Sequence, residues 1–341
     1  MSENENDVQL TPGDPAVRKK CRRTYALISL ALCISYCLAF TASVFFSKYI
    51  VELYNNGKIP LPAAQVNAIL SFGPMYLICF PLVFLALSRM KKAAPAQQEK
   101  TGFKQLLIYY SMCFPIMLAG STIGNVLSAL LSRGESQNHM AQLLSNVDPL
   151  VIIITTVFAP IVEELLFRKF IIDRTVQFGE KTAILFSGLS FGLFHMNLYQ
   201  FFYAFGIGVL LAYIYIRTGK VRYSIFLHVG VNLIGSVLVP FLLRQSDYME
   251  FMKKISSMNI EAALNSPNLV WVIIYMIYST LYFAVVCYGF VMIITKRKSL
   301  TFTIREHELA FREGLFLSVV NVGTIIYFIA SILFFTRSLF L

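Results

Sequence analysis

The sequence predicts an all-α fold, a polytopic transmembrane bundle of about eight or nine helices. Hydrophobic residues make up 57% of the 341 residues, charged residues only 14%, and the mean hydropathy is +0.66. Soluble domains usually carry about 25% charged residues, so this chain needs lipid as its solvent. Its apolar residues also fall in runs that approach or exceed the roughly 20 residues that a helix needs to cross a bilayer.

Nine apolar runs are the expected spans. The sixth is the weakest, because it is short and only a very tight turn at 199–202 separates it from the fifth. In order, the runs cover residues 24–46, 66–87, 105–131, 148–172, 182–199, 201–216, 223–243, 269–294 and 314–335.

The connections between these runs are short, and the longest extends from Arg244 to Asn268. No soluble domain of ordinary size is therefore expected. The first run is too long and too far from Met1 for a cleavable signal peptide, so we expect it to stay as an anchor. We divide the chain into a disordered cytoplasmic tail (1–17), N-terminal transmembrane helices (18–147), a core that holds the polar residues described below (148–245) and C-terminal transmembrane helices (246–341).

The net charge of +11 is explained by topology. If the N-terminus is cytoplasmic, 22 of the 29 Lys and Arg residues face the cytoplasm and seven face the other side. This bias predicts a cytoplasmic N-terminus and an external C-terminus. It also argues against nucleic-acid binding. The segments expected inside are 18–23, 89–104, 168–181, 217–222 and 296–312.

The six Cys residues show no CxxC pairs, so they indicate neither a disulfide framework nor a zinc knuckle. The chain shows no internal repeat, which disfavours a transporter, since many transporters are built from inverted repeats. Ionisable side chains inside a bilayer are costly and mark candidate functional sites. Here, apart from Cys and Tyr, they fall in the fourth, fifth and seventh spans.

The fourth span holds two adjacent carboxylates. Neighbouring helix positions point about 100° apart, so Glu163 and Glu164 cannot both face one small pocket. Glu164 can pair with Arg168 four residues later. Glu163 is then free to project between helices, and Pro160 is expected to loosen the backbone just before it. The alternative is a solvated helix end at the cytoplasmic surface.

The other polar groups lie on the fifth and seventh spans. His195 shares a helix face with Gly188 and Gly192, whose spacing permits a neighbouring helix to approach closely. His228 and Asn232 are one turn apart and share a face. Taken singly, each of these groups could be an interhelical hydrogen bond that serves packing alone.

Together, a carboxylate, two imidazoles and an amide can activate water and stabilise an oxyanion. Glu163, His195 and His228 could also form a catalytic zinc site, although the chain has no HExxH motif. With straight helices of ~1.5 Å per residue, Glu163 and His228 would lie about 8–9 Å below the cytoplasmic boundary and His195 about 20 Å below it. On that simple geometry the site does not close.

These residues carry a resemblance to a known family. Glu163-Glu164-x-x-x-Arg168, Phe191-x-x-x-His195 and His228-x-x-x-Asn232 follow in order the motifs EExxxR, FxxxH and HxxxN. The chain thus resembles the type II CAAX prenyl endopeptidases and the bacterial CPBP intramembrane proteases, which include the bacteriocin-processing Abi-like proteins. The motifs cover about residues 145–245, and the family core is associated with eight spans.

The resemblance implies an endopeptidase that cleaves a peptide or lipidated, CAAX-like segment near the cytoplasmic face of the membrane. We expect this membrane to be a bacterial cell membrane, whose lipids surround the protein. The resemblance also implies that Glu163 polarises the attacking water and that His195 holds this water or ligates a metal. Glu164 and Arg168 would orient the helix end. His228 and Asn232 would donate to the oxyanion, or His228 would complete a Zn²⁺ site.

Two other functions stay open from the residues. One is a non-catalytic regulator or scaffold of the same family, although every motif position holds a chemically competent side chain. The other is a proton-coupled transporter in which Glu163 and the histidines relay protons.

Overall fold

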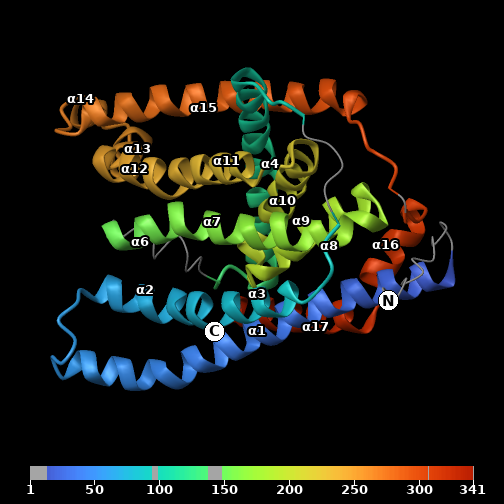
Figure 1. Ribbon diagram of the computed structural model, residues 1–341. Coiled ribbons are helices and arrows are strands. Elements are labelled where there is room, and N and C mark those ends of the chain that lie inside the picture. Colours follow the sequence, from blue (N-terminus) through green and yellow to red (C-terminus); the bar gives the residue numbers. More distant parts are fainter. Residues whose placement is uncertain (1–13, 94–98, 137–147, 306, 341) are drawn as a thin grey trace.

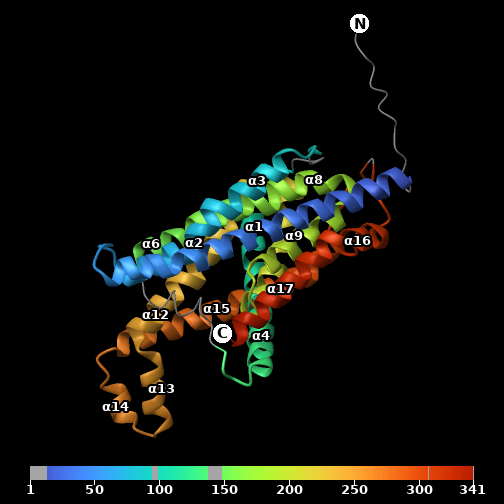
Figure 2. The ribbon, with the colours of Figure 1, turned by 90° about the horizontal axis from the view of Figure 1, so that it is seen from below.

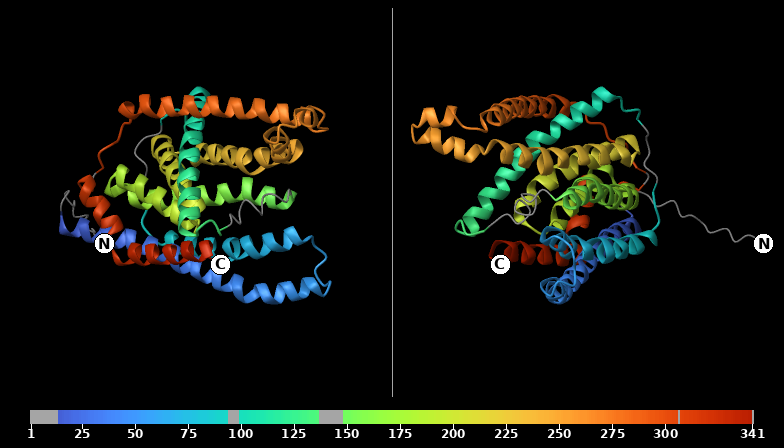
Figure 3. Two further views of the ribbon diagram at one scale, coloured as in Figure 1. Left: turned by 180° about the vertical axis from the view of Figure 1, so that it is seen from behind. Right: turned by 90° about the vertical axis from the view of Figure 1, so that its left-hand side faces the viewer.

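The computed structural model describes residues 14–93, 99–136, 148–305 and 307–340. Over these residues it contains helices and no strand, which confirms the all-α prediction. Figure 1 shows most helices lying side by side in one direction, while α4 crosses them steeply. The two further views in Figure 3 show the same crossing from behind and from one end.

The N-terminal part of the chain forms the first three spans. Asp14 caps the first helix, which begins at Pro15 and so includes three residues predicted as tail; residues 1–13 of that tail lie outside the described residues. The elements are α1 (Pro15–Asn55), α2 (Ala63–Pro74), the π-helical turn η1 (Met75–Cys79), α3 (Phe80–Ser88) and α4 (Phe103–Leu131).

The middle of the chain is built from broken helices. The fourth span contains α6 (Pro149–Ile153), the π turn η2 (Ile154–Phe158), α7 (Ala159–Glu164), the π segment η3 (Leu165–Ile172), α8 (Asp173–Thr175) and the 3₁₀ turn η4 (Val176–Phe178). Next come α9 (Glu180–Phe194) and α10 (Leu198–Thr218). The seventh predicted span consists of α11 (Val221–Leu233), the π turn η5 (Ile234–Leu238) and α12 (Val239–Ser246).

The C-terminal part adds α13 (Tyr248–Ser256), α14 (Ile260–Leu264), α15 (Leu269–Lys296), the 3₁₀ turn η6 (Arg297–Ser299), α16 (Phe311–Val319) and α17 (Val322–Phe340). The connection predicted from Arg244 to Asn268 therefore contains two short helices. Figure 2 shows α13 and α14 at one end of the molecule, outside the main bundle.

Among the described residues, eight helices are long and apolar enough to cross a membrane. The exception among the nine predicted spans is the fifth. Its helix α9 has 15 residues and stops at Phe194, because Met196 has a positive φ of 50° and the Asn197 side chain caps α10. The predicted turn at 199–202 was therefore placed too late, and the sixth span, predicted as the weakest, is a 21-residue helix.

The described parts of the five segments predicted to face the cytoplasm lie toward one side of the molecule, on the right in Figure 1. We call this side the basic face. Long-range contacts join its segments: Arg18 with Glu313, Ala93 with Asp173, Arg217 with Glu99 and Thr301, and Arg305 with Glu180. α17 packs along α1 in the same direction, because Gly323 meets Ala26 and the ring of Phe334 packs on Phe40. The described chain therefore ends toward the opposite face.

Glycines let the central helices approach closely. A Cβ atom on Gly188 would lie 2.9 Å from the Val209 nitrogen, and one on Gly192 would lie 2.9 Å from the Phe201 oxygen. The partner of the predicted glycine face on α9 is thus α10. On its other side, α10 meets α4 at Gly120 and Gly124. These contacts fix the end of α9, where His195 lies.

Candidate active site

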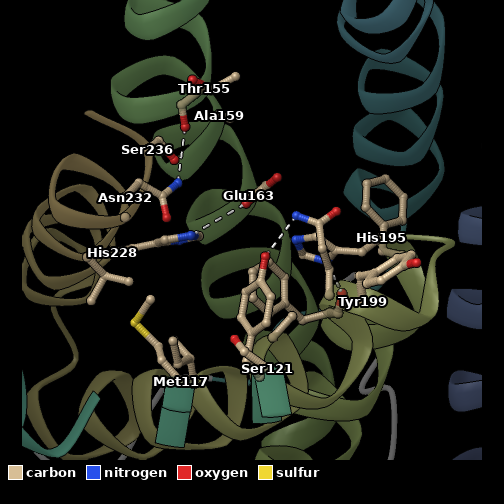
Figure 4. Close-up of a pocket in the computed structure, with 18 of the residues that line it drawn as sticks. Met117, Ser121, Thr155, Ala159, Glu163, His195, Tyr199, His228, Asn232 and Ser236 are labelled. Carbon is tan, nitrogen blue, oxygen red and sulfur yellow. Dashed lines mark hydrogen bonds and ion pairs between the residues drawn. The ribbon is translucent and has the colours of Figure 1, made fainter. Parts of the chain in front are cut away.

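The structure brings the predicted polar groups together at a cavity of about 880 Å³ in the middle of the bundle. Glu163, His195, His228 and Asn232 all line this cavity, whereas Glu164 and Arg168 lie behind its wall. Figure 4 shows the carboxylate of Glu163 and the ring of His228 pointing toward each other.

The depth mismatch expected from straight helices disappears for Glu163 and His195. The fourth span extends to Phe178 and turns at Gly179, which has a φ of 126°. Glu163 precedes this glycine by 16 residues, and His195 follows it by 16 residues. Because both sides of the hairpin are helical, the two side chains reach about the same depth. The predicted boundary at residue 172 was six residues too early.

Glu164 belongs to a buried ionic frame. Its Oε2 lies 2.9 Å from Nε of Arg168, and both side chains are fully buried. Its Oε1 lies 3.0 Å from Nδ1 of His228. Arg168 also donates to the hydroxyl of Ser187 at 3.4 Å, and its guanidinium lies over the ring of Phe191. The predicted pairing of Glu164 with Arg168 is confirmed as a contact.

Glu163 is held differently. Its Oε2 lies 3.8 Å from Nε2 of His228, longer than a hydrogen bond, and its side chain is 17% exposed. This carboxylate therefore keeps acceptor capacity toward the cavity. The solvated helix end that we considered as an alternative is wrong, because the pair lies in the middle of a span and Glu164 is fully buried.

Both imidazoles are fixed by their Nδ1 atoms. In His228 this atom meets the carboxylate of Glu164, and in His195 it lies 2.9 Å from the carbonyl oxygen of Phe191. A carbonyl oxygen can only accept, so Nδ1 of His195 carries the proton and Nε2 of the neutral ring is an acceptor. Nε2 of His228 is the atom that faces Glu163.

Asn232 is positioned by a proline on another helix. In η2 the N–H of Ala159 bonds to the carbonyl of Ile154, so the carbonyl of Thr155 would pair with residue 160. Residue 160 is Pro and has no N–H. The side-chain nitrogen of Asn232 donates to this carbonyl instead, at 3.0 Å. The expected loosening before Glu163 is thus a π turn.

Sequence reasoning missed several polar residues of the cavity. Tyr199, Gln200 and Tyr203 line it from the start of α10, and Ser121 and Asn125 line it from α4. The side-chain nitrogen of Gln200 donates to the hydroxyl of Tyr203 at 2.8 Å. Two signals in the sequence could have pointed to them: Asn197 as a helix cap, and the four-residue spacing of Ser121 and Asn125.

The predicted zinc ligands do not form a metal-binding cluster. No three His, Cys, Asp or Glu side chains gather closely enough in the described part of the chain. Of the predicted set, Glu163 and His228 come within 4 Å of each other, but His195 does not complete a close group of three ligands with them. The side chains as placed therefore do not fit a three-ligand zinc site.

Comparisons with known proteins agree with the motifs. Residues 145–234 match the family model described as "Type II CAAX prenyl endopeptidase Rce1-like". The chain is also 29% identical over 164 residues to "Putative membrane peptidase YdiL" of Bacillus subtilis (strain 168). That match covers 46% of this chain and 66% of the relative, just under two thirds of its length. No solved structure gives a significant match.

Proposed function

From the membership of residues 145–234 in the type II CAAX prenyl endopeptidase family, we propose that this multi-pass membrane protein is an intramembrane endopeptidase. The observation that carries the proposal is the division of labour between two adjacent carboxylates. Glu164 is committed to Arg168 and His228, while Glu163 faces the cavity beside two oriented imidazoles.

Glu163 acts as the general base. As a water oxygen attacks the carbonyl carbon of the scissile peptide bond, the carboxylate takes one of its protons. When the C–N bond of the tetrahedral intermediate breaks, the same proton passes to the leaving nitrogen. The products are a free carboxylate and a free amine, and no outside reactant besides water is needed.

His195 and His228 orient the reacting groups. The acceptor Nε2 of His195 holds the second hydrogen of the water. His228 is oriented through Nδ1 by the buried Glu164, and in its protonated form donates from Nε2 to the oxyanion. Asn232 uses one amide hydrogen on Thr155 and keeps a second one for the same oxyanion. The predicted zinc enters no step here and stays a prediction that metal analysis of the purified protein would test.

The proposal is tested by the peptides that the protein produces. Membranes of cells that express the parent chain, the Glu163→Gln variant or neither are compared by peptide mass spectrometry. We expect cleavage products that appear only with the parent chain. An identical peptide set from the parent and from a normally inserted Glu163→Gln protein would overturn the proposal. The substrate found in this way also decides between a lipidated CAAX-like segment and a plain peptide.

A further inference from the structure

Three π turns contribute to the cavity wall, and in each case a proline stands two residues after the last residue of the turn. They are η1 with Pro81, η2 with Pro160 and η5 with Pro240. In each, the proline removes the N–H that would meet the carbonyl five residues earlier. Those carbonyls belong to Tyr76, Thr155 and Gly235, and all three residues line the cavity.

The side-chain amide of Asn232 donates a hydrogen bond to the carbonyl of Thr155. The carbonyls of Tyr76 and Gly235 lack the π-helical N–H donor that proline removes. Irregular backbone at membrane depth is tolerated where it is buried in protein or lines a water-filled cavity. The three breaks therefore place irregular backbone along the wall of this cavity.

A polar stripe leads along α11 and α12 away from the active site. Its polar members are His228, Asn232, Ser236 and Arg244, which together with Pro240 recur every four residues and all line the cavity. In a regular α-helix a four-residue spacing drifts by about 40° per step. The wider π turn η5 in the middle of the stripe turns less per residue and offsets this drift, so the stripe stays on the cavity.

The stripe ends at the face opposite the basic face. α11 starts beside the basic face at Val221 and α12 ends at Ser246, on the far side. Among the described residues that line the cavity, the acidic, imidazole and cationic side chains are those of Glu163, His195, His228 and Arg244. Arg244 is exposed, and no described carboxylate lies within ion-pair distance of it. The cavity thus has an acid at its inner end and an unpaired cation at its rim.

We propose that the substrate is a peptide segment that enters from the face opposite the basic face, and that Arg244 binds a carboxylate of this segment. This inference rests on the proposed function for the position of the scissile bond at Glu163. It differs from the cytoplasmic-face cleavage expected from the family resemblance, because Arg244, an exposed residue of the cavity lining, lies at the other end.

The helix geometry sets the spacing of the carboxylate from the scissile bond. Arg244 follows His228 by 16 residues, which is about 24 Å of helix at ~1.5 Å per residue. An extended peptide covers about 3.3 Å per residue, and the arginine side chain shortens the remaining gap. The carboxylate therefore lies about five to seven residues from the cleaved bond.

Binding without cleavage tests the role of Arg244. In the Glu163→Gln background, fluorescein-labelled apolar peptides carrying one Glu, or Gln at the same position, are titrated against the full chain in detergent. We expect Glu peptides to bind about tenfold more tightly, an advantage equivalent to ~1.4 kcal/mol, and Arg244→Ala to remove it. The matched control is Arg133→Ala, which replaces an exposed arginine outside the cavity lining and should keep the advantage.

Two further binding experiments identify the group that supplies the carboxylate. Peptides ending in a free carboxylate are compared with their amides, which distinguishes a C-terminus from an acidic side chain; either result supports the proposal. Titration is repeated with added phosphatidylglycerol. If the Glu preference is unchanged in Arg244→Ala, or if Arg244 is needed for lipid binding and not for peptide binding, the proposal is overturned.

The side of entry is tested independently of any substrate. A membrane-impermeant maleimide is applied to spheroplasts and to inside-out vesicles that contain Ser236→Cys, Arg222→Cys or the parent chain as background. We expect Ser236→Cys to react in spheroplasts and Arg222→Cys, on the basic face, to react only in vesicles. Protection of Ser236→Cys in spheroplasts contradicts entry from the external side. Because no step needs turnover, this failure is distinct from the absence of cleavage.

Discussion

Two adjacent carboxylates of the same helix occupy different environments. Glu164 is fully buried between Arg168 and His228, whereas Glu163 faces the cavity. The sequence predicted this separation, since adjacent helix positions point apart and Arg168 lies four residues after Glu164. It could not predict that His228 contacts both carboxylates, because that contact joins residues 64 positions apart and depends on how α11 packs.

Removing one partner of the buried ion pair should destabilise the protein. Glu164→Leu leaves the guanidinium of Arg168 buried without a counter-ion, at a cost of about 3–5 kcal/mol. The double variant Glu164→Leu with Arg168→Leu removes both charges and should recover most of this loss. Unfolding in detergent measures both, and a single variant as stable as the parent would contradict the buried pair.

At the level of elements, the positions of most helices followed from the apolar runs. The fourth and fifth spans did not, because their ends depend on local geometry: a positive φ at Gly179 and the cap supplied by Asn197. The π turns were also missed. Their signal is a proline two residues after each turn, but a proline in a helix indicates only a kink or break until the neighbouring helix is known.

The contribution of Asn232 to the free energy of unfolding should depend on Pro160. Replacing Asn232 by Leu leaves the carbonyl of Thr155 unpaired inside the bundle, at a cost of about 1–3 kcal/mol. In a Pro160→Ala background the restored N–H can take that carbonyl, so the same replacement should cost less. A double-mutant cycle of unfolding free energies measures the difference. Equal costs in the two backgrounds would show that the two residues are not coupled.

The close packing of α9 on α10 gives a further prediction. Gly188→Ala places a methyl group 2.9 Å from the Val209 nitrogen and 3.1 Å from the Phe205 oxygen, so the backbones must separate. We expect a loss of about 1–3 kcal/mol together with a loss of cleavage, because His195 ends this helix. Gly73→Ala is the control, since its methyl group meets only the side chain of Ile69 at 3.9 Å. A stable, active Gly188→Ala protein would contradict this packing.

For the whole molecule, the charge pattern predicted which segments share a face, and the structure brings those segments together at the basic face. The assignment of that face to the cytoplasm rests on the positive-inside bias alone. The reach of the cavity toward the other face could not be predicted, because its wall comes from at least six helices, including α1, α2 and α4 of the N-terminal part.

Topology can be tested with reporter fusions. Alkaline phosphatase fused after Leu341 should be active, because the C-terminus is expected outside, whereas a fusion after Lys298 on the basic face should be inactive. Green fluorescent protein at the same two positions should give the opposite pattern. Active phosphatase at Lys298 would invert the proposed orientation.

The central claim is that Glu163 activates the water that cleaves a peptide in this cavity. It is tested most directly by following one peptide identified in the membrane comparison, with purified parent, Glu163→Gln and Glu135→Gln proteins of matched melting temperature. Glu135 is exposed and lies outside the cavity. We expect the parent and Glu135→Gln to cut at equal rates and Glu163→Gln to be slower by about 10²-fold or more. Cleavage by Glu163→Gln at the parental rate would contradict the account.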